Sequence, residues 1–581
     1  MIGMKGVTAL LSGIILLTLS ANAVAQPIPG QPGWLDTAVF YQIYPSSFQD
    51  SDGDGIGDIP GITSRLEYVS SVGVNAIWLN PIFWSSWKDG GYDVIDYYLC
   101  DPRFGTNDDV VAMIEKAHSL GLKVIFDLVA GHSSSESPWF KQAQQGTNLQ
   151  YSDYYIFPTF KPTPDDARIS RDFNYEQITN QNDAVTRQFS DIDAPRAPYY
   201  VRNAGAYQPA LNYGYRNPNP DHPWEQAVDA PGPMAVRQEM KDIMAFWFEK
   251  GVDGFRVDMA FSNVKNDDAD KTETIKVWQD INGWVRKNYP QNVMIAEWFN
   301  PKQAIDGLFH LDFFCHSQRY NYSTLFFNLS RRDGSFQDCY FDKAGKGELK
   351  TWFDLYDYQY QAVKGRGYAS LPTSNHDYQR PATIYRNDLD ELKIVMTFFL
   401  TMPGAPFIYY GDEIGMKYFQ DVKAVEGGGT RTGTRTPMQW DSSVDAGFST
   451  APESKLYVPL DPDVANRPTV EKQQNDPNSL LNYTRALIKL RAASPALSNN
   501  GEWKMVSSLD QPYPMVYERW SGRERYWVVI NPSGKTVSVT LPAESVKPEP
   551  VCGNYKKFSY KQTKKGDTIQ ISGVSSAILK F

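Results

Sequence analysis

Gly254-Phe255-Arg256-Val257-Asp258 and Val293-Met294-Ile295-Ala296-Glu297 are two short, mostly apolar runs that each end in a carboxylate. Helical spacing of apolar residues precedes each run, over 235–249 and over 273–287. Short apolar strands that alternate with amphipathic helices are typical of a parallel sheet covered by helices. The two runs therefore predict repeated strand–helix units whose carboxylates lie at the carboxyl ends of the strands.

The same alternation extends in both directions along the chain. Further helical spacing occurs over 62–72 and 108–120 and, after Pro477, over 478–492. From residue 38 onward there are eight strand candidates, at 39–44, 76–79, 123–127, 254–258, 293–297, 310–314, 368–374 and 406–410. Eight such units make a (β/α)8, or TIM, barrel. We therefore predict an α/β protein built on this barrel.

The chain of 581 residues is too long for one compact core, so we expect more than one domain. The alternation stops over 128–233, a stretch rich in Pro, Asn, Gln, Tyr and Asp that is too long for a loop. We predict a small inserted domain B there, after the third strand. From residue 499 to 581, short alternating runs predict an antiparallel β-sandwich domain. The barrel would then comprise 26–127 and 234–498.

The N-terminus has the pattern of a signal peptide. Lys5 precedes an apolar run over 7–19, and Ala23-Val24-Ala25 supplies small residues for cleavage. That run is short for a membrane span, and no other stretch is long and apolar enough to cross a bilayer. We predict that residues 1–25 are removed on export to the periplasm or the medium, with no stable membrane insertion afterwards. An uncleaved anchor is the alternative.

Composition narrows the choice of partners. The formal net charge is −10 and there is no basic stripe, so nucleic acid is not an expected partner. The four cysteines, at 100, 315, 339 and 552, do not have the spacing of a metal site. Export permits a Cys315–Cys339 disulfide, but the sequence leaves both this pairing and the oligomeric state open.

Polar and acidic residues follow several of the predicted strands. They are Asp127, Asp258, Glu297 and the run Asn375-His376-Asp377. The active site of a TIM barrel lies at the carboxyl ends of its strands, so these side chains should converge on one pocket. A single aspartate at such a place is more often a turn residue or a helix cap. Carboxylates that end several separate strands are much harder to explain in that way.

Converging carboxylates suit the cleavage of glycosidic bonds. The leaving oxygen needs a proton, and the positively charged transition state of the sugar needs a nearby anion. A retaining enzyme uses one carboxylate as nucleophile and another first as acid and then as base. Arg256 lies two residues before Asp258, so both side chains point to the same side of the strand. We expect this cation to keep Asp258 ionised, as a nucleophile requires.

From about residue 38 to the C-terminus, the chain resembles the α-amylase superfamily, glycoside hydrolase family 13. The run 254–258 looks like the family's nucleophile motif, 295–298 like its acid/base motif and 374–377 like its third catalytic motif. The resemblance implies Asp258 as nucleophile, Glu297 as acid/base and Asp377 as the residue that binds sugar hydroxyls and stabilises the transition state. It also implies substrate contacts by residues beside them, Arg256 and His376.

The stretch from Asp127 to His132 is similar to the first motif of the family. In relatives the histidine of this motif contacts the sugar in the −1 subsite; a structural histidine is the alternative. The residue before it is usually Asn, which often ligates a calcium ion between the barrel and the inserted domain. Gly131 stands here instead and has no side chain to do so.

A calcium site is better supported in the run Asp50-Ser51-Asp52-Gly53-Asp54-Gly55-Ile56-Gly57-Asp58. Carboxylates alternate there with glycines that permit a tight loop, and hard oxygen donors suit Ca²⁺. Similar loops bind calcium in relatives that resemble oligo-1,6-glucosidases. The expected donors to this structural ion are Asp50, Asp52, Asp54, Asp58 and the carbonyl of Ile56. A turn without metal is the alternative.

The resemblance also bears on the substrate. Asp89-Gly90-Gly91-Tyr92 is similar to a segment in which the Tyr stacks on the −1 sugar. In exo-acting relatives its Asp pairs with an Arg three residues after the transition-state Asp, here Arg380. An Asp89–Arg380 pair would close the pocket around a terminal glucose, unless it is only a surface ion pair. The residues 259–262 after the nucleophile lack the Lys-His of many enzymes that act on long polymers.

Other motifs point in two directions. The runs 411–416 and 435–440 resemble oligo-1,6-glucosidases, α-glucosidases and trehalose synthases, whereas 297–299 looks more like cyclodextrinases. We expect a retaining, exo-acting α-glucosidase on short α-glucosides or malto-oligosaccharides. The alternatives are a transglycosylase or sugar isomerase with the same covalent intermediate, an endo-acting amylase or cyclodextrinase, and a binding protein without activity. The linkage that is cleaved stays open.

Overall fold

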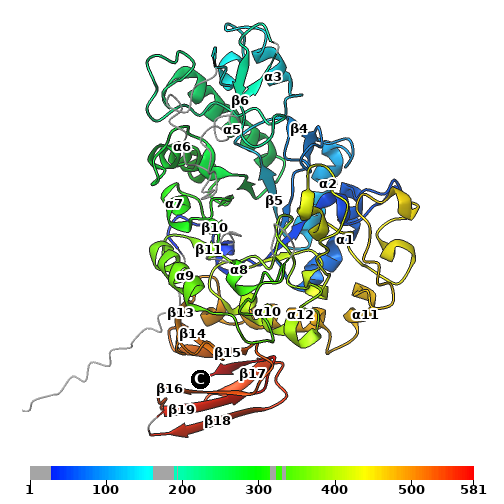
Figure 1. The fold of residues 1–581 in the computed structure, drawn as a ribbon, viewed down its shortest axis with the longest axis vertical. Helices are drawn as coiled ribbons and strands as arrows, with labels where there is room; N and C mark the ends of the chain where they lie inside the picture. Colours follow the sequence, from blue (N-terminus) through cyan, green and yellow to red (C-terminus); the bar gives the residue numbers. More distant parts are fainter. Residues whose placement is uncertain (1–27, 161–188, 193, 315–321, 330–334, 565) are drawn as a thin grey trace, which may run out of the picture.

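The computed structural model describes residues 28–160, 189–192, 194–314, 322–329, 335–564 and 566–581. Its centre is a sheet of eight parallel strands in the order β11-β10-β9-β8-β5-β2-β1-β12 (Figure 1). The two ends of this sheet meet again, because Pro372, just after β11, forms a parallel bridge to Phe407 in β12. The sheet is therefore rolled into a nearly closed barrel, which confirms the predicted TIM architecture.

Each of the eight predicted runs corresponds to one strand of the barrel, and β5 extends one residue beyond its run. The strands are short and, apart from Lys123 at the start of β5, their residues are buried, because side chains fill the barrel on one face and helices cover the other. Asp258 and Glu297 come one residue after β8 and β9. The strands are β1 (Phe40–Ile43), β2 (Ala76–Leu79), β5 (Lys123–Leu128), β8 (Gly254–Val257), β9 (Val293–Ala296), β10 (Leu311–Phe313), β11 (Tyr368–Ser370) and β12 (Phe407–Tyr409).

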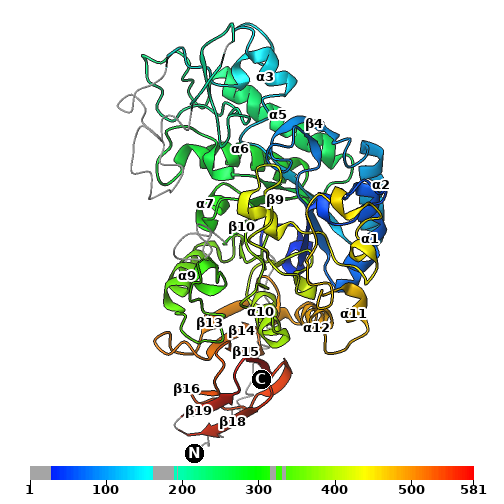
Figure 2. The same cartoon turned by 45° about the vertical axis from the view of Figure 1, so that its right-hand side comes forward.

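Helices surround the sheet, as the two views in Figures 1 and 2 show. Local signals set where several of them begin. Thr106 and Asp109 form a reciprocal capping box at the start of α2, and Asp388 and Glu391 do the same for α10. The helices are α1 (Ile59–Val72), α2 (Asn107–Ser119), α5 (Pro231–Phe248), α6 (Thr272–Asn288), α7 (Pro301–Asp306), α8 (Tyr322–Leu325), α9 (Lys350–Val363), α10 (Leu389–Thr401), α11 (Val470–Gln474) and α12 (Leu480–Ala492).

Two excursions leave the barrel on the side where its strands end. The first, between β2 and α2, is the pair β3 (Phe83–Ser85) and β4 (Val94–Cys100). The second lies between β5 and α5 and contains α3 (Pro138–Ala143) and the hairpin of β6 (Phe189–Asp191) and β7 (Tyr199–Val201). It forms the upper part of Figure 1. Its return path lies beside the residues after β5, since the Leu211 amide donates to the Gly131 carbonyl at 3.1 Å.

The C-terminal part is antiparallel and consists of two sheets, β13-β14-β15-β20-β17 and β16-β19-β18. A small apolar core that includes Val516, Trp527, Ile569 and Ile571 lies between them. This arrangement is the predicted β-sandwich, at the bottom of Figure 1. Its strands are β13 (Glu502–Met505), β14 (Met515–Ser521), β15 (Glu524–Asn531), β16 (Val537–Leu541), β17 (Glu549–Gly553), β18 (Phe558–Thr563), β19 (Gly566–Ile571) and β20 (Ser575–Lys580).

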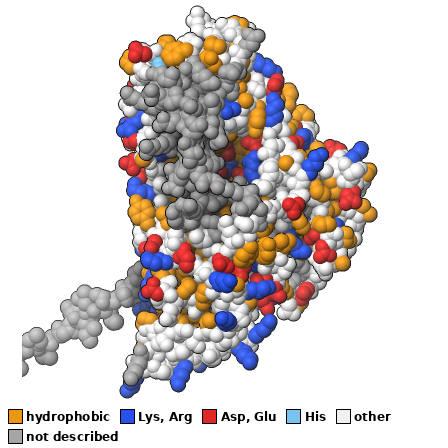
Figure 3. All heavy atoms as spheres, in the orientation of Figure 1, with side chains coloured by type: hydrophobic (Ala, Val, Ile, Leu, Met, Phe, Trp, Pro, Cys, Tyr) orange, Lys and Arg blue, Asp and Glu red, His pale blue; other side chains and the backbone are white. Residues whose placement is uncertain are grey.

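Three further observations bear on the surface and on the cysteines. The face drawn in Figure 3 mixes acidic and basic side chains. Within the described ranges, no helix has both the length and the apolar character that crossing a bilayer needs. Cys100 and Cys339 are buried thiols, whereas Cys315 lies outside the described residues, so the Cys315–Cys339 pairing stays a prediction.

Candidate active site

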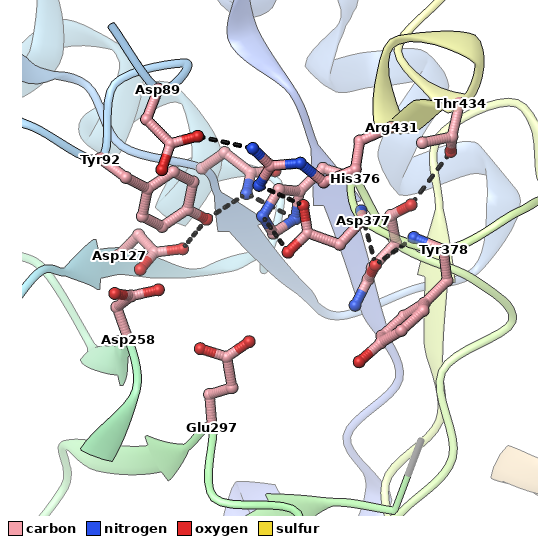
Figure 4. Close-up of polar contacts among 12 residues, drawn as sticks. Asp89, Tyr92, Asp127, Asp258, Glu297, His376, Asp377, Tyr378, Arg431 and Thr434 are labelled. Atoms are coloured by element: carbon pink, nitrogen blue, oxygen red, sulfur yellow. Dashed lines mark hydrogen bonds and ion pairs between the residues drawn. The ribbon is translucent and has the colours of Figure 1, made fainter. Parts of the chain in front are cut away.

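Three carboxylates meet at the carboxyl ends of β5, β8 and β9, which are neighbours in the sheet. Asp127 is the next-to-last residue of β5 and lies opposite Arg256 in β8. Asp258 and Glu297 continue the ladder, because their amides donate to the carbonyls of Leu128 and Val257, both at 3.0 Å. Parallel register therefore brings residues far apart in the chain to one point, and Figure 4 shows Asp127, Asp258 and Glu297 close together.

Arg256 is the cation of this cluster and is 1% exposed. Its Nη1 lies 2.8 Å from Asp127 Oδ1 and 3.2 Å from Asp258 Oδ1, and its Nη2 lies 2.9 Å from Glu297 Oε2. Burial and the charge of Glu297 raise the pKa of Asp258 well above its ordinary value, and Arg256 opposes that rise without cancelling it. Arg256 therefore acts on Asp258 in the expected direction, since it favours the ionised carboxylate, but the same guanidinium also serves Asp127 and Glu297. That Arg256 keeps Asp258 ionised stays a prediction.

The sharing of one positive charge among three carboxylates has a chemical consequence. Burial is also the main cause that raises the pKa of Asp127, to about 6. Like charges held close together favour the retention of a proton within the group. Glycosyl transfer with retention needs such a state, with one carboxyl protonated as acid while its neighbour is an ionised nucleophile.

Tyr92 is held as a flat wall beside the carboxylates. Its hydroxyl donates to Asp127 Oδ2 at 2.9 Å and accepts a hydrogen bond from Asn80 Nδ2 at 2.8 Å. Its ring stacks on His376 with the ring centres 5.3 Å apart and the planes at 10°. The amides of Gln42 and Asn80 both face His376 Nδ1, at 3.1 and 3.0 Å, so this nitrogen accepts and Nε2 carries the proton.

Sequence analysis missed Gln42 and Asn80, although both have a recognisable signal. Gln42 is a buried polar residue inside the apolar strand β1, and Asn80 directly follows β2. A polar residue in an otherwise apolar barrel strand, or just after one, belongs to the same class of position as Asp127. Applied to every strand, that rule finds both residues.

His132 lies beside this wall but is fully occupied by protein groups. Its Nε2 is 2.7 Å from the Tyr92 carbonyl and its Nδ1 is 2.9 Å from Asn203 Nδ2. Since the asparagine amide donates, Nδ1 accepts and Nε2–H donates to the carbonyl. Burial lowers the pKa of His132 to about 4, so the ring is neutral. Its contact with a sugar stays a prediction. A Cβ at Gly131 would lie 2.9 Å from Asn203 Nδ2, so this amide occupies the space that a side chain at 131 would need.

Asp377 and Asp89 are joined by an arginine that we did not predict. Arg431 places Nη1 3.2 Å from Asp377 Oδ1 and Nη2 2.6 Å from Asp89 Oδ1 (Figure 4). Arg435 adds a second contact to Asp377 Oδ1 at 3.1 Å. Arg431 lies in a short 3-10 helix, Gly429–Thr434, four residues before Arg435 in the motif that had been singled out.

The predicted Asp89–Arg380 pair is wrong. Arg380 is 0% exposed and its Nη1 pairs with Asp412 Oδ1 at 2.9 Å. The same guanidinium donates to the carbonyls of Tyr410 and Thr434 at 2.6 and 3.0 Å. The side chain thus enters the barrel wall beside the end of β12, where a buried carboxylate is available, and not the pocket.

The acidic loop before α1 brings together three of its four aspartates. Carboxylate oxygens of Asp50, Asp52 and Asp58 lie within 4.8 Å of one another, and Asp58 caps α1 by accepting from the Gly61 amide at 2.6 Å. Asp54 lies outside this group. Burial and then the charges of the other three raise its pKa. Oxygen donors with mutual repulsion fit a divalent cation, although in this conformation Asp50 Oδ1 also accepts from the amides of Asp52 and Gly53.

Comparisons with known proteins agree with this geometry. Residues 42–500 match the family model described as alpha amylase, catalytic domain. The chain is 30% identical over 557 residues to an oligo-1,6-glucosidase of Parageobacillus thermoglucosidasius, covering 88% of this chain and 92% of that protein. It is 31% identical over 551 residues to an alpha-glucosidase of Culex pipiens, covering 91% and 87%.

Two further proteins are similar to this chain. A trehalose synthase/amylase of Mycobacterium tuberculosis is 30% identical over 511 residues, covering 82% of this chain and 78% of that protein. Isomaltulose synthase from Erwinia rhapontici has the same fold, with a TM-score of 0.75 over 94% of this chain and 99% of the other at 24% identity.

Proposed function

Because the chain belongs to the α-amylase family, we propose that it is a retaining, exo-acting α-glucosidase that removes glucose from the ends of short α-glucosides or malto-oligosaccharides. The carbohydrate substrate and the retaining glycosidase chemistry follow from the family and its relatives. The exo action rests on one observation in this chain, the bridge from Asp89 through Arg431 to Asp377.

The carboxylate pair supplies the two chemical steps. Asp258 attacks the anomeric carbon while Glu297 protonates the leaving oxygen, which gives a covalent glucosyl-enzyme. Glu297 then takes a proton from water, which attacks the same carbon and releases Asp258. Arg256 contacts both side chains, at 3.2 Å from Asp258 Oδ1 and 2.9 Å from Glu297 Oε2, and so holds the two carboxylates on one side of the site, as a nucleophile and an acid/base that act on the same sugar require. Asp377 binds sugar hydroxyls across the pocket.

The bridge explains why only a chain end would fit. Asp89 lies on the connection between β3 and β4, Asp377 follows β11, and Arg431 comes from the segment after β12. Their ion pairs tie three rim segments together across one end of the pocket. The Arg431 side chain is 25% exposed, so part of its guanidinium remains open to sugar hydroxyls. A polymer that must continue past this point is blocked, whereas a terminal glucose is held.

Transfer or isomerisation is the second candidate. The trehalose synthase/amylase relative matches 82% of this chain at 30% identity, the same identity as that of the oligo-1,6-glucosidase relative, which matches 88%. Both reactions proceed through the same glucosyl-enzyme and differ only in whether water or a sugar hydroxyl attacks it.

Two features outside the pocket complete the proposal. A structural Ca²⁺ held by Asp50, Asp52, Asp54, Asp58 and the Ile56 carbonyl would fasten the loop that leads into α1. The three grouped carboxylates support this site. The N-terminal pattern over residues 1–25 supports export to the periplasm or the medium.

The first experiment is the early product profile of the purified enzyme on maltotetraose. Glucose plus maltotriose, with the glucose released as the α-anomer in proton NMR, is the expected result. Maltose as first product means that the pocket is open and the enzyme is endo-acting. Products longer than maltotetraose mean transfer. If the enzyme does not cleave maltotetraose, the same assay is repeated with isomaltose, sucrose and trehalose. Release of the β-anomer would overturn the retaining mechanism, and Asp258→Asn serves as the inactive control.

A further inference from the structure

The acid/base Glu297 is held on one side by the β8 segment. Its amide donates to the Val257 carbonyl, and its own carbonyl accepts from the Ala260 amide at 3.1 Å. The carboxylate Oε2 accepts from the Met259 amide at 2.8 Å. Met259 has a φ of +43°, an uncommon backbone conformation for a residue with a side chain. The nucleophile side of the site therefore fixes both the backbone and the carboxylate of Glu297.

On the other side, β10 supplies one carboxylate. Asp312 lies opposite Ala296 in the parallel register of β9 and β10. Its Oδ1 accepts from the amides of Trp298 and Phe299, at 2.9 and 3.3 Å. These are the two residues that follow Glu297. Hydrogen bonds thus hold the backbone and the carboxylate of Glu297, and the Asp312 carboxylate accepts from the amides of both residues that follow.

The conformation that these hydrogen bonds hold is an unfavourable one. Phe299 has a φ of +60°, and a left-handed backbone is energetically unfavourable at a bulky residue. Two hydrogen bonds to one oxygen offset such a cost. Without them the segment from Trp298 to Phe299 has a more favourable backbone available, and Glu297 would move with it.

Burial of the Asp312 carboxyl group itself costs free energy. The residue is 0% exposed and burial raises its pKa well above the ordinary value for an aspartate. Its Oδ2 has no hydrogen-bond partner among the described residues. An apolar residue at this buried strand position would avoid the desolvation cost. A hydrogen-bond acceptor that costs stability at this position is explained if it has a role in function.

We propose that Asp312 is a positioning residue for the acid/base, which fixes the place of the Glu297 carboxylate by holding the backbone that follows it. This inference rests on the proposed role of Glu297. Displacement of a catalytic group by about 1 Å costs roughly 100-fold in rate. Loss of Asp312 should therefore reproduce the defects of a missing acid/base, although Asp312 touches neither substrate nor reacting atoms.

The test uses Asp312→Ala beside Glu297→Ala and compares two leaving groups. One substrate is the best α-glucoside from the product assay, whose leaving oxygen needs a proton; the other is α-glucosyl fluoride, whose leaving fluoride needs little acid assistance. Asp312→Ala should lose roughly 100-fold in kcat/KM on the first and less than about fivefold on the second. Added azide should attack the glucosyl-enzyme without base help and give α-glucosyl azide in both variants.

Two further variants separate positioning from general damage. Asp312→Asn keeps an acceptor oxygen at the same place. On the α-glucoside whose leaving oxygen needs a proton, its kcat/KM should be at least ten-fold higher than that of Asp312→Ala. Asp253→Ala removes a buried aspartate at the other end of β8, where it accepts from the Val124 amide at 2.9 Å. It should lower the melting temperature without changing the ratio between the two substrates. If Asp312→Ala does not fold, Asp312→Ser, too short to reach both amides, takes its place.

Suppose that Glu297→Ala shows both the leaving-group dependence and the azide product. Asp312→Ala would then overturn this inference alone if it lost equal activity on both substrates or gave no glucosyl azide. The same follows if Asp312→Asn is as slow as the alanine variant. If Glu297→Ala itself shows neither the leaving-group dependence nor the azide product, the proposed role of Glu297 fails first.

Discussion

Replacement of Arg431 by alanine should turn a pocket that accepts chain ends into an open cleft. The change removes the guanidinium that lies 2.6 Å from Asp89 and 3.2 Å from Asp377. Asp377 keeps Arg435 at 3.1 Å, and Asp89 keeps the amide of Gln208 at 3.1 Å. The bridge between the two carboxylates is nevertheless lost, and with it the contact that closes the pocket.

The expected magnitude follows from these contacts. Hydrogen bonds between charged groups contribute about 1.5–3 kcal/mol. The residual partners and the partial exposure of all three side chains place the loss near the lower part of that range. We expect about 2 kcal/mol, or about a 30-fold fall in kcat/KM on maltose. On maltotetraose, the first products should change from glucose plus maltotriose to a mixture that contains maltose.

The assay is product analysis in the first few per cent of maltotetraose turnover, together with kcat/KM on maltose. Lys88→Ala is a matched control, because it removes a cation from an exposed pair with Glu136 on the same rim. It should leave both measurements within about twofold, as exposed ion pairs contribute little. If Arg431→Ala still releases only glucose and maltotriose, with kcat/KM within twofold of the parent enzyme, the bridge does not close the pocket.

Three other predictions concern metal, a buried arginine and pH. Chelation with EDTA should lower the free energy of unfolding by about 2–3 kcal/mol, and added Ca²⁺ should restore it. The reason is that an ion that binds only the folded loop stabilises the folded state by mass action. If neither EDTA nor Ca²⁺ changes the melting temperature, the calcium site is excluded. Arg380→Ala should destabilise the fold by about 3–5 kcal/mol in denaturant unfolding, because it leaves the buried Asp412 carboxylate without its cation. KM of the folded enzyme should stay the same. A raised KM with unchanged stability would mean that Arg380 contacts the sugar after all. Burial lowers the pKa of His310 to about 3. Between about pH 6.5 and 3, His310 is therefore protonated in the unfolded chain and neutral in the folded chain. Unfolding free energy should therefore fall as pH drops from about 6.5 toward 3, and His310→Gln should reduce that slope by up to one proton; an unchanged slope would contradict the assignment.

The sequence by itself determined the barrel and the acidic residues at its rim. Both are local properties: mostly apolar runs of four to seven residues alternate with amphipathic stretches, and Asp258 and Glu297 follow their strands directly. Parallel strands present their carboxyl ends on one side, so chain order alone was enough to gather these side chains. The same reasoning, applied to polar positions within β1 and after β2, reaches Gln42 and Asn80.

Only the tertiary structure decided which charges pair. Asp89 and Arg431 are 342 positions apart in the chain and meet through two loops whose paths no local pattern specifies. Arg380 is closer in sequence to Asp377, yet its side chain lies in the barrel wall, because Asp412 and two carbonyl groups satisfy its donors there. The pKa of Asp258 likewise depends on how many carboxylates share Arg256 and how deeply they are buried. Such long-range pairing and burial are properties of the folded chain as a whole, because water is excluded only after distant segments have packed together.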